Sequence, residues 1–172
     1  YSTRYELRHA ISTIMTIYYN DIGKLVLVAP VNDYNITALK VGSLLYDTDR
    51  DVTFIIANTK IETDANRITA NGYTANWLLN KRCIASKYKL TNLESGIYGI
   101  INANIRGIPR LTTASVEGLK ERTNTILHGG QILDEIQPFL EEAELGNKMI
   151  WDPDALRHTF KVYKGADLTD GI

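Results

Sequence analysis

Two apolar segments near the start of the chain constrain the fold more than any other feature. ISTIMTIYY and KLVLVA lie between Ile11 and Ala29, on either side of the turn sequence Asn20-Asp21-Ile22-Gly23. Their β-branched and aromatic residues favour strands over helices, so this segment is predicted to form a β-hairpin. The four residues LVLV are apolar at both alternating positions, which predicts a strand covered on both faces by other protein, such as a neighbouring subunit.

Further strands are expected in the first half of the chain, over residues 44–46, 52–61 and 67–71. Turn sequences rich in Asp and Asn separate them, and the segment VNDYNITA is predicted to be a polar loop. Thr74 can cap a short helix that follows the last of these strands. A strand-rich module closing with a short helix is therefore expected over residues 1–85.

Residues 86–172 are expected to form a second, α/β module. Thr91 and Glu94 have the spacing of a capping box, and isoleucines at helical spacing follow them. A second amphipathic helix is predicted after Gly129-Gly130; its Pro138 should kink it or shift its start, since an interior proline costs about 3 kcal/mol. MIW and HTFKVYKG are predicted to be a C-terminal hairpin. The predicted fold class is therefore α+β.

Composition excludes several classes of protein. The 172 residues are 44% hydrophobic and 23% charged, which is typical of an ordinary globular protein. A net charge of -1 favours neither nucleic acid nor a membrane surface as a partner, and no apolar run approaches the roughly 20 residues that span a bilayer. The lone Cys83 and the absence of a signal-peptide core at the N-terminus favour assembly in a reducing cytoplasm. Because the chain starts at Tyr1 and stops just after a predicted strand, we expect a longer protein.

One motif resembles the start of a calcium-binding loop. Asp47, Asp49 and Asp51 alternate as the first ligands of an EF-hand loop do. However, Val52 occupies the position that needs glycine, and Asn58 the position that needs a bidentate glutamate. A solvated hairpin turn is the better interpretation of this segment.

Other reactive residues do not form a catalytic or metal-binding pattern. His9, His128 and His158 are isolated, and His158 alternates with apolar residues as a partly buried strand histidine does. Cys83 is expected to be buried as a small hydrophobic residue. No GxSxG nucleophile motif is present, and although distant carboxylate pairs stay open, the glutamates at 141, 142 and 144 are expected to be solvated. The sequence therefore predicts no catalytic residue, metal or cofactor.

Two remaining patterns concern binding surfaces. The basic cluster at Lys81, Arg82, Lys87 and Lys89 includes Tyr88, which could stack on a base, but a charged rim between two modules is the more economical interpretation. Ten tyrosines against three phenylalanines supply amphipathic area of the kind enriched at protein interfaces. The tyrosine content favours assembly, and no contact with nucleic acid is predicted.

The order of features resembles a known family. An early hairpin is followed by NGYTANWLLNKRCI, by a capped helix containing INANI, and by ILDEIQPFLEEAELGNKMIWDPD and FKVYKGADLT. This order is similar to that of the hub or tail-associated proteins of siphophages and related prophages. The residues that match the family pattern are Gly72, Leu78, Leu79, Arg82, Gly146, Asp152, Phe160, Gly165, Asp167 and Thr169.

The resemblance implies a structural, non-enzymatic part of a bacteriophage tail tip. Such hubs are homotrimers that join tail tube to tip, with tail-tube-like β-barrel or sandwich modules forming a ring and a smaller α/β module beside them. Implied partners are tail tube, distal tail and tip proteins, and the implied location is the virion tail, assembled in the host bacterial cytoplasm. A cell-wall hydrolase or a carbohydrate- or receptor-binding module for host attachment is the alternative. On the hub interpretation, the expected subunit interface comprises Met15, Ile17, Tyr18, Tyr19, Leu25, Leu27, Phe54 and Ile56.

Overall fold

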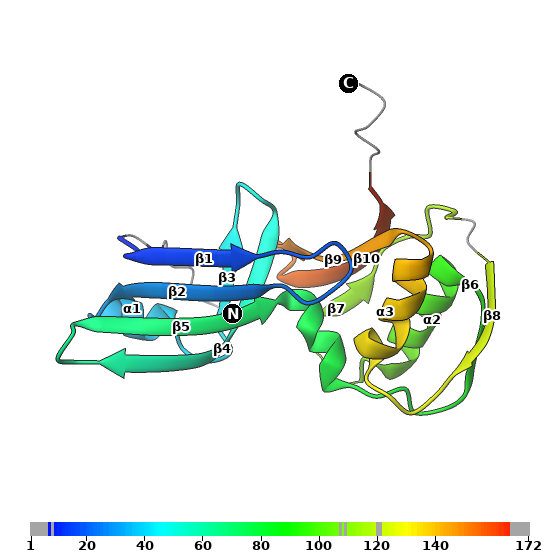
Figure 1. The fold of residues 1–172 in the computed structure, drawn as a ribbon, viewed down its shortest axis with the longest axis horizontal. Helices are drawn as coiled ribbons and strands as arrows, with labels where there is room; N and C mark the ends of the chain where they lie inside the picture. The colour runs from blue at the N-terminus through cyan, green and yellow to red at the C-terminus, as the bar shows by residue number, and fades with distance from the viewer. Residues whose placement is uncertain (1–6, 8, 107, 109, 120–121, 166–172) are drawn as a thin grey trace, which may run out of the picture. The chain divides into compact units, whose positions relative to one another are not determined.

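A computed structural model describes residues 7, 9–106, 108, 110–119 and 122–165 of the chain (Figure 1). The chain forms two compact units. Unit 1 contains Tyr1–Tyr18 and Ile22–Ala75, and unit 2 contains Tyr19–Asp21 and Asn76–Ile172. The main division therefore falls after Ala75, earlier than the expected boundary at 85/86, and unit 2 includes three residues from inside the predicted hairpin. The matching residues Asp167 and Thr169 lie outside the described part.

Unit 1 is built on one antiparallel sheet of five strands in the order β1-β2-β5-β4-β3. The predicted hairpin is confirmed as β1 paired with β2, and the other expected strands are present with somewhat different bounds. The α+β class is confirmed, and the expected barrel is a half-barrel sheet. The strands are β1 Ser12–Thr16, β2 Lys24–Pro30, β3 Leu44–Asp47, β4 Val52–Glu62 and β5 Arg67–Thr74.

The side chains of β2 are alternately buried and exposed, and the buried ones form part of the core of unit 1. Leu25 and Leu27 are each 1% exposed, and they pack in one cluster with Phe54 and Ile56 of β4. Successive side chains of a strand point to opposite faces, so Val26 lies on the other face, where it is 37% exposed. Within this chain, the LVLV strand is therefore fully buried on one face only.

The segment predicted as a polar loop contains the helix α1 (Asp33–Ala38). Asn32 caps it, because the Asn32 side chain accepts a hydrogen bond from the backbone N–H of Asn35 at 2.8 Å. The following residue, Leu39, is buried in the core cluster. The loop prediction was wrong because a helix of six residues is too short to show a periodic pattern of apolar residues.

Unit 2 combines short sheets with two longer helices, α2 (Leu93–Asn104) and α3 (Ile132–Glu142). One sheet has the order β7-β10-β9, with β10 parallel to β7 and antiparallel to β9, and β6 pairs with β8 in a separate two-stranded sheet. The C-terminal hairpin, β9 with β10, is confirmed, whereas β6, β7 and β8 were not predicted. The strands are β6 Tyr88–Asn92, β7 Leu111–Thr113, β8 Arg122–Leu127, β9 Leu145–Asp152 and β10 Arg157–Lys164, and the 3-10 helix η1 spans Ala75–Lys81.

The start of α2 is confirmed, but the predicted capping box is wrong. Asn92, not Thr91, is the N-cap, and its side chain accepts from the backbone N–H of Ser95 at 3.1 Å. Glu94 is 0% exposed and turns to another segment, where its carboxylate accepts hydrogen bonds from the backbone N–H groups of residues 117, 118 and 119 at 2.7–2.9 Å. The glutamate thus holds a loop against the helix instead of closing the helix's own first turn.

Pro138 lies inside α3 without shifting its start, which is at Ile132. The side chain of Pro138 is exposed, while Ile132, Ile136 and Leu140 are 0% exposed on the opposite side. Because Pro138 faces solvent, the N–H that it lacks costs α3 one backbone hydrogen bond, and the packing of the buried side of the helix is not disturbed.

Two buried asparagines of unit 2 hold the segment Tyr19–Asp21. Asn147 donates to the carbonyl of Asn20 at 2.7 Å and accepts from the Asn76 amide at 2.9 Å. The backbone N–H of Asn147 also donates to the carbonyl of Tyr19 at 2.9 Å. Because both amide side chains are only 3% exposed, these bonds satisfy groups that would otherwise be buried without partners.

His158 is a buried group of unit 2 without such partners. It is 3% exposed, its ring lies 4.6 Å from the Trp151 ring centroid to centroid, and neither ring nitrogen has a hydrogen-bond partner among the described residues. Burial lowers the pKa of His158 from 6.5 to about 4. The expected strand histidine is therefore confirmed, and it is a neutral core residue at neutral pH.

Glu94→Gln is expected to lower the free energy of unfolding of unit 2 by about 2 kcal/mol, because an amide offers fewer acceptor sites to the three backbone donors. Both tryptophans, Trp77 and Trp151, belong to unit 2, so denaturant titration followed by tryptophan fluorescence reports this unit. The matched control is Glu141→Gln on the exposed side of α3, expected to change stability by less than about 0.5 kcal/mol. Equal losses in the two variants would contradict the role given to Glu94.

Acid is expected to destabilise unit 2 through His158. Because its pKa is about 4 when folded and 6.5 when unfolded, the unfolded state binds the proton first as the pH falls. The stability is complete above pH 6.5 and declines by at most about 3 kcal/mol down to pH 4. In the same fluorescence titration, His158→Leu should lose less stability over this interval, since carboxylates titrate equally in both proteins. Parallel pH profiles would refute the assignment.

Candidate assembly surface

The structure divides the predicted interface residues into two groups. Leu25, Leu27, Phe54 and Ile56 are 0–1% exposed in the core of unit 1, so the folded chain does not offer them to a partner. Met15 also packs against this core. Sequence reasoning selected these residues for their apolar character, which a core and an interface share. The remaining predicted residues are Ile17, Tyr18 and Tyr19.

Of these three, Tyr19 is largely engaged within unit 2. Its hydroxyl donates to the carbonyl of Glu144 at 3.2 Å and accepts from the backbone N–H of Gly165 at 2.5 Å. Its ring meets Tyr163 edge-on, with centroids 5.2 Å apart. Ile17 and Tyr18 are 49% and 46% exposed, and they stay candidates for contact with another molecule.

The outer face of the unit 1 sheet supplies two apolar residues that the prediction did not include. Ile14 of β1 and Val26 of β2 are direct cross-strand partners, and they are 62% and 37% exposed. Both lie opposite the core-facing leucines of β2. We use "outer face" for Ser12, Ile14, Val26, Val28, Asn58, Thr69 and Asn71.

One row of the outer face is uncharged, and lysines lie beside it. In the register of the sheet this row is Ile14, Val26, Asn71 and Asn58. The next row, Ser12, Val28 and Thr69, continues to the exposed Lys60, and Lys24 precedes Val26 on the same face of β2. Apolar, hydroxyl and amide side chains desolvate at lower cost than charged ones. The signal for this surface was in the sequence, since it is the valine half of LVLV.

The acidic segment after β3 forms a turn, as expected. The Asp47 carboxylate accepts from the backbone N–H groups of Asp49 and Arg50 and from the Arg50 guanidinium at 2.9 Å. Burial raises the pKa of Asp47, but these hydrogen bonds outweigh it and hold the pKa below its ordinary value. The carboxylate is thus occupied with the geometry of its own turn.

Among the described residues, no group of three or more His, Cys, Asp or Glu side chains could hold a metal ion. Cys83 is exposed, which corrects the prediction that it is buried. It forms an isolated antiparallel bridge with Gln131, and this extended backbone position directs its side chain outward. Ile84 beside it is the residue that enters the core, at 3% exposed.

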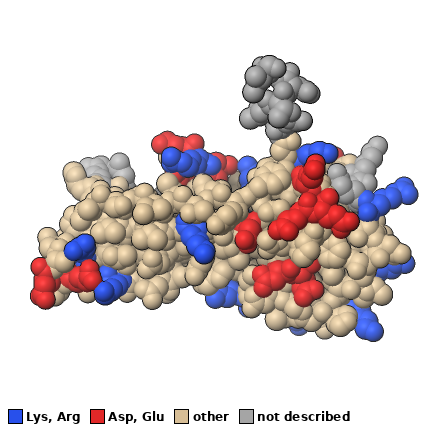
Figure 2. All heavy atoms as spheres, viewed as in Figure 1, with Lys and Arg blue, Asp and Glu red and all other residues tan. Residues whose placement is uncertain are grey.

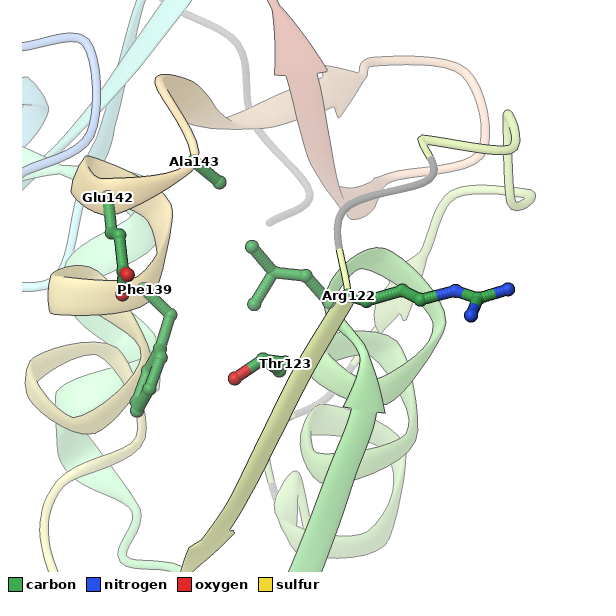
Figure 3. Close-up of a pocket in the computed structure, with 6 residues that line it drawn as sticks. Arg122, Thr123, Phe139, Glu142 and Ala143 are labelled. Atoms are coloured by element: carbon green, nitrogen blue, oxygen red, sulfur yellow. The ribbon is translucent and has the colours of Figure 1, made fainter.

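A shallow pocket of about 290 Å³ lies in unit 2. Figure 3 shows Phe139 and Glu142 of α3 on one side of it and Thr123 of β8 on the other, while the guanidinium of Arg122 points away. The polar groups at the pocket therefore do not converge as a general acid, a base and a nucleophile would need to. Its lining is completed by Leu93 and Ala143.

Comparison with known proteins adds a family and a fold. The sequence matches, over residues 1–171, the family described as Siphovirus ReqiPepy6 Gp37-like protein. Comparison with curated proteins gives no match. No helix among the described residues is both long and apolar enough to cross a membrane.

Two solved structures share the fold at low identity. Prophage tail protein gp18 from Listeria monocytogenes EGD-e is 15% identical, with a TM-score of 0.58 over 87% of this chain and 44% of that one. The E. coli c3393 protein, a component of the type VI secretion system with structural similarity to bacteriophage tail proteins gp27 and gp5, is 10% identical, with a TM-score of 0.55 over 90% of this chain and 47% of that one. The chain spans less than half the length of either protein.

Proposed function

The chain belongs to the Siphovirus ReqiPepy6 Gp37-like protein family, and from this membership we propose that it is a structural component of a bacteriophage tail whose copies associate into a ring. In this proposal the ring is the hub that joins the tail tube to the tip. The observation that carries it is the exposed apolar pair Ile14 and Val26 on the outer face of unit 1, in a row that Asn71 and Asn58 continue without a charge.

The outer face suits a permanent contact for two physical reasons. Burial of apolar area contributes about 25 cal/mol per Å², so covering a largely exposed isoleucine and its valine partner stabilises a complex. The neighbouring Asn and Thr side chains can hydrogen-bond across an interface without the desolvation cost of a charge. A strand with two apolar faces then has both faces covered once a neighbouring subunit docks on it.

Ring formation would also cover the unpaired edge strands of the sheet. In the described part of the chain, β1 and β3 are the outermost strands and each has one strand neighbour. Unpaired strand edges favour uncontrolled association, and closure of a symmetric ring removes that risk. Ile17 and Tyr18 follow directly after β1, where a subunit pairing with this edge would meet them.

The finer features of the proposal follow from the resemblance of the sequence to tail hub proteins. The ring would be a homotrimer, with tail tube, distal tail and tip proteins as neighbours. It would be located in the virion tail after assembly in the cytoplasm of the host bacterium. The proposal assigns the chain no enzymatic role, no cofactor and no contact with nucleic acid, and no specific observation favours a cell-wall hydrolase or a receptor-binding module.

Ile14→Lys is expected to weaken self-association of the chain, because it places a charge in the uncharged row formed by Ile14, Val26, Asn71 and Asn58. Light scattering after size-exclusion chromatography should show the unmodified chain heavier than one copy and the variant closer to one. The folded chain should keep its stability to within about 0.5 kcal/mol, since Ile14 is 62% exposed. Val41→Lys is the matched control, because Val41 is 65% exposed and lies between α1 and β3 of unit 1, outside the strands of the sheet. A strictly monomeric unmodified chain, or equal effects of both variants, would contradict the proposal.

A further inference from the structure

Unit 2 carries two segments of opposite charge. Residues 123–147 contain no Lys or Arg, and residues 80–93 contain no Asp or Glu. Figure 2 shows acidic side chains gathered over the part of unit 2 where Figure 1 places α3. We call the first set the acidic helix face, Asp134, Glu135, Glu141, Glu142 and Glu144, and the second the basic segment, Lys81, Arg82, Lys87 and Lys89.

The described part of the chain does not neutralise either set by ion pairing. Ion pairs between described residues involve Asp47, Glu62 and Glu117 with their own basic partners, not these side chains. On the acidic helix face, Asp134 accepts from the neutral amide of Asn80 at 2.6 Å, and Glu141 accepts from that of Gln137 at 2.9 Å. In the basic segment, Lys81 lies over the Trp77 ring at 3.7 Å and Arg82 donates to the backbone carbonyls of Arg106 and Lys81, whereas Lys87 and Lys89 are exposed. The acidic helix face and these two lysines are therefore available to charges of another molecule.

The glutamates at the C-terminal end of α3 do not stabilise that helix. Glu141 and Glu142 lie in the last turn of α3, and Glu144 follows it, with no basic residue in that turn. The C-terminal end of a helix carries partial negative charge, so carboxylates there are disfavoured by the helix itself and by each other. A cation supplied from outside would remove both unfavourable terms.

The pocket beside these glutamates has the chemistry to receive a lysine side chain. Leu93, Phe139 and Ala143 offer apolar surface for an aliphatic stem, and the carboxylate of Glu142 stands at the same pocket. Lysine places its stem along apolar surface and its ammonium group near water or a carboxylate in this way. The guanidinium of Arg122, the one basic group of the lining, points away from the pocket in Figure 3 and leaves it open to a cation.

We propose that the acidic helix face and the adjoining pocket are the docking surface for a second copy of this chain, which contributes its basic segment. This inference rests on the proposed function, the formation of a ring. A ring of more than two identical subunits requires two different, complementary surfaces on every subunit. Residues 80–82 lie against the N-terminal end of α3 in the same chain, so the pair we assign is the glutamates at its C-terminal end with Lys87 and Lys89 of the other copy. Their complementary charge identifies another copy as the occupant.

Charge reversal tests the inference. Glu141→Lys/Glu142→Lys makes both surfaces basic, and Lys87→Glu/Lys89→Glu makes both acidic. Each variant should associate about tenfold more weakly than the unmodified chain in sedimentation velocity at low salt, because like charges then face each other. The variant with all four changes should recover self-association, and an equal mixture of the two parent variants should form mixed complexes. Added salt should weaken the unmodified complex through screening.

Controls separate this inference from the proposed function. Asp49→Lys/Asp64→Lys reverses two exposed turn carboxylates of unit 1 and should leave association unchanged. If the reversals in unit 2 also leave association unchanged, the docking surface is overturned while self-association stands, and a different basic partner becomes the candidate for α3. If the four-change variant does not recover association, the complementary pairing is overturned as well. A chain that is monomeric before any substitution overturns the proposed function together with this inference.

Discussion

Unit 1 depends on how β2 divides its apolar residues between the two faces of the sheet. Leu25 and Leu27 enter the core with Phe54 and Ile56, and the same register places Val26 beside Ile14 on the outer face. A slip by one residue would exchange the two sets, burying the valines and exposing the leucines. Core and candidate assembly surface are therefore two results of one register, so a change in strand pairing would alter both.

Unit 2 is organised differently, around buried polar groups that have partners. Glu94 binds three backbone N–H groups of a loop, and Asn76 and Asn147 together hold the segment Tyr19–Asp21. Such groups are costly to bury alone and specific when paired, so they fix where these segments lie. His158 is the exception, because among the described residues its ring nitrogens have no partner and burial keeps the ring neutral.

The family and the exposed surfaces both support a structural component of a bacteriophage tail. The chain belongs to a siphovirus protein family, and the described residues display exposed apolar and charged side chains on the surfaces of both units. The outer face of unit 1 favours contact through burial of apolar side chains, and the charged surfaces of unit 2 favour contact through complementary charge. In the proposed ring, apolar contact supplies affinity, while complementary charge selects the orientation in which copies meet.

The sequence by itself determined the hairpin of β1 and β2, the α+β class, the two longer helices and the C-terminal hairpin, because strand alternation and helical spacing are local patterns. It also carried the family resemblance. Tertiary structure alone decided which apolar residues face the core, so that four of the expected interface residues are buried and Ile14 and Val26 are exposed. It likewise decided that Glu94 binds a distant loop and that Cys83 is exposed. The reason is that local patterns record which residues are apolar or charged, whereas burial and hydrogen-bond partners depend on segments far away along the chain.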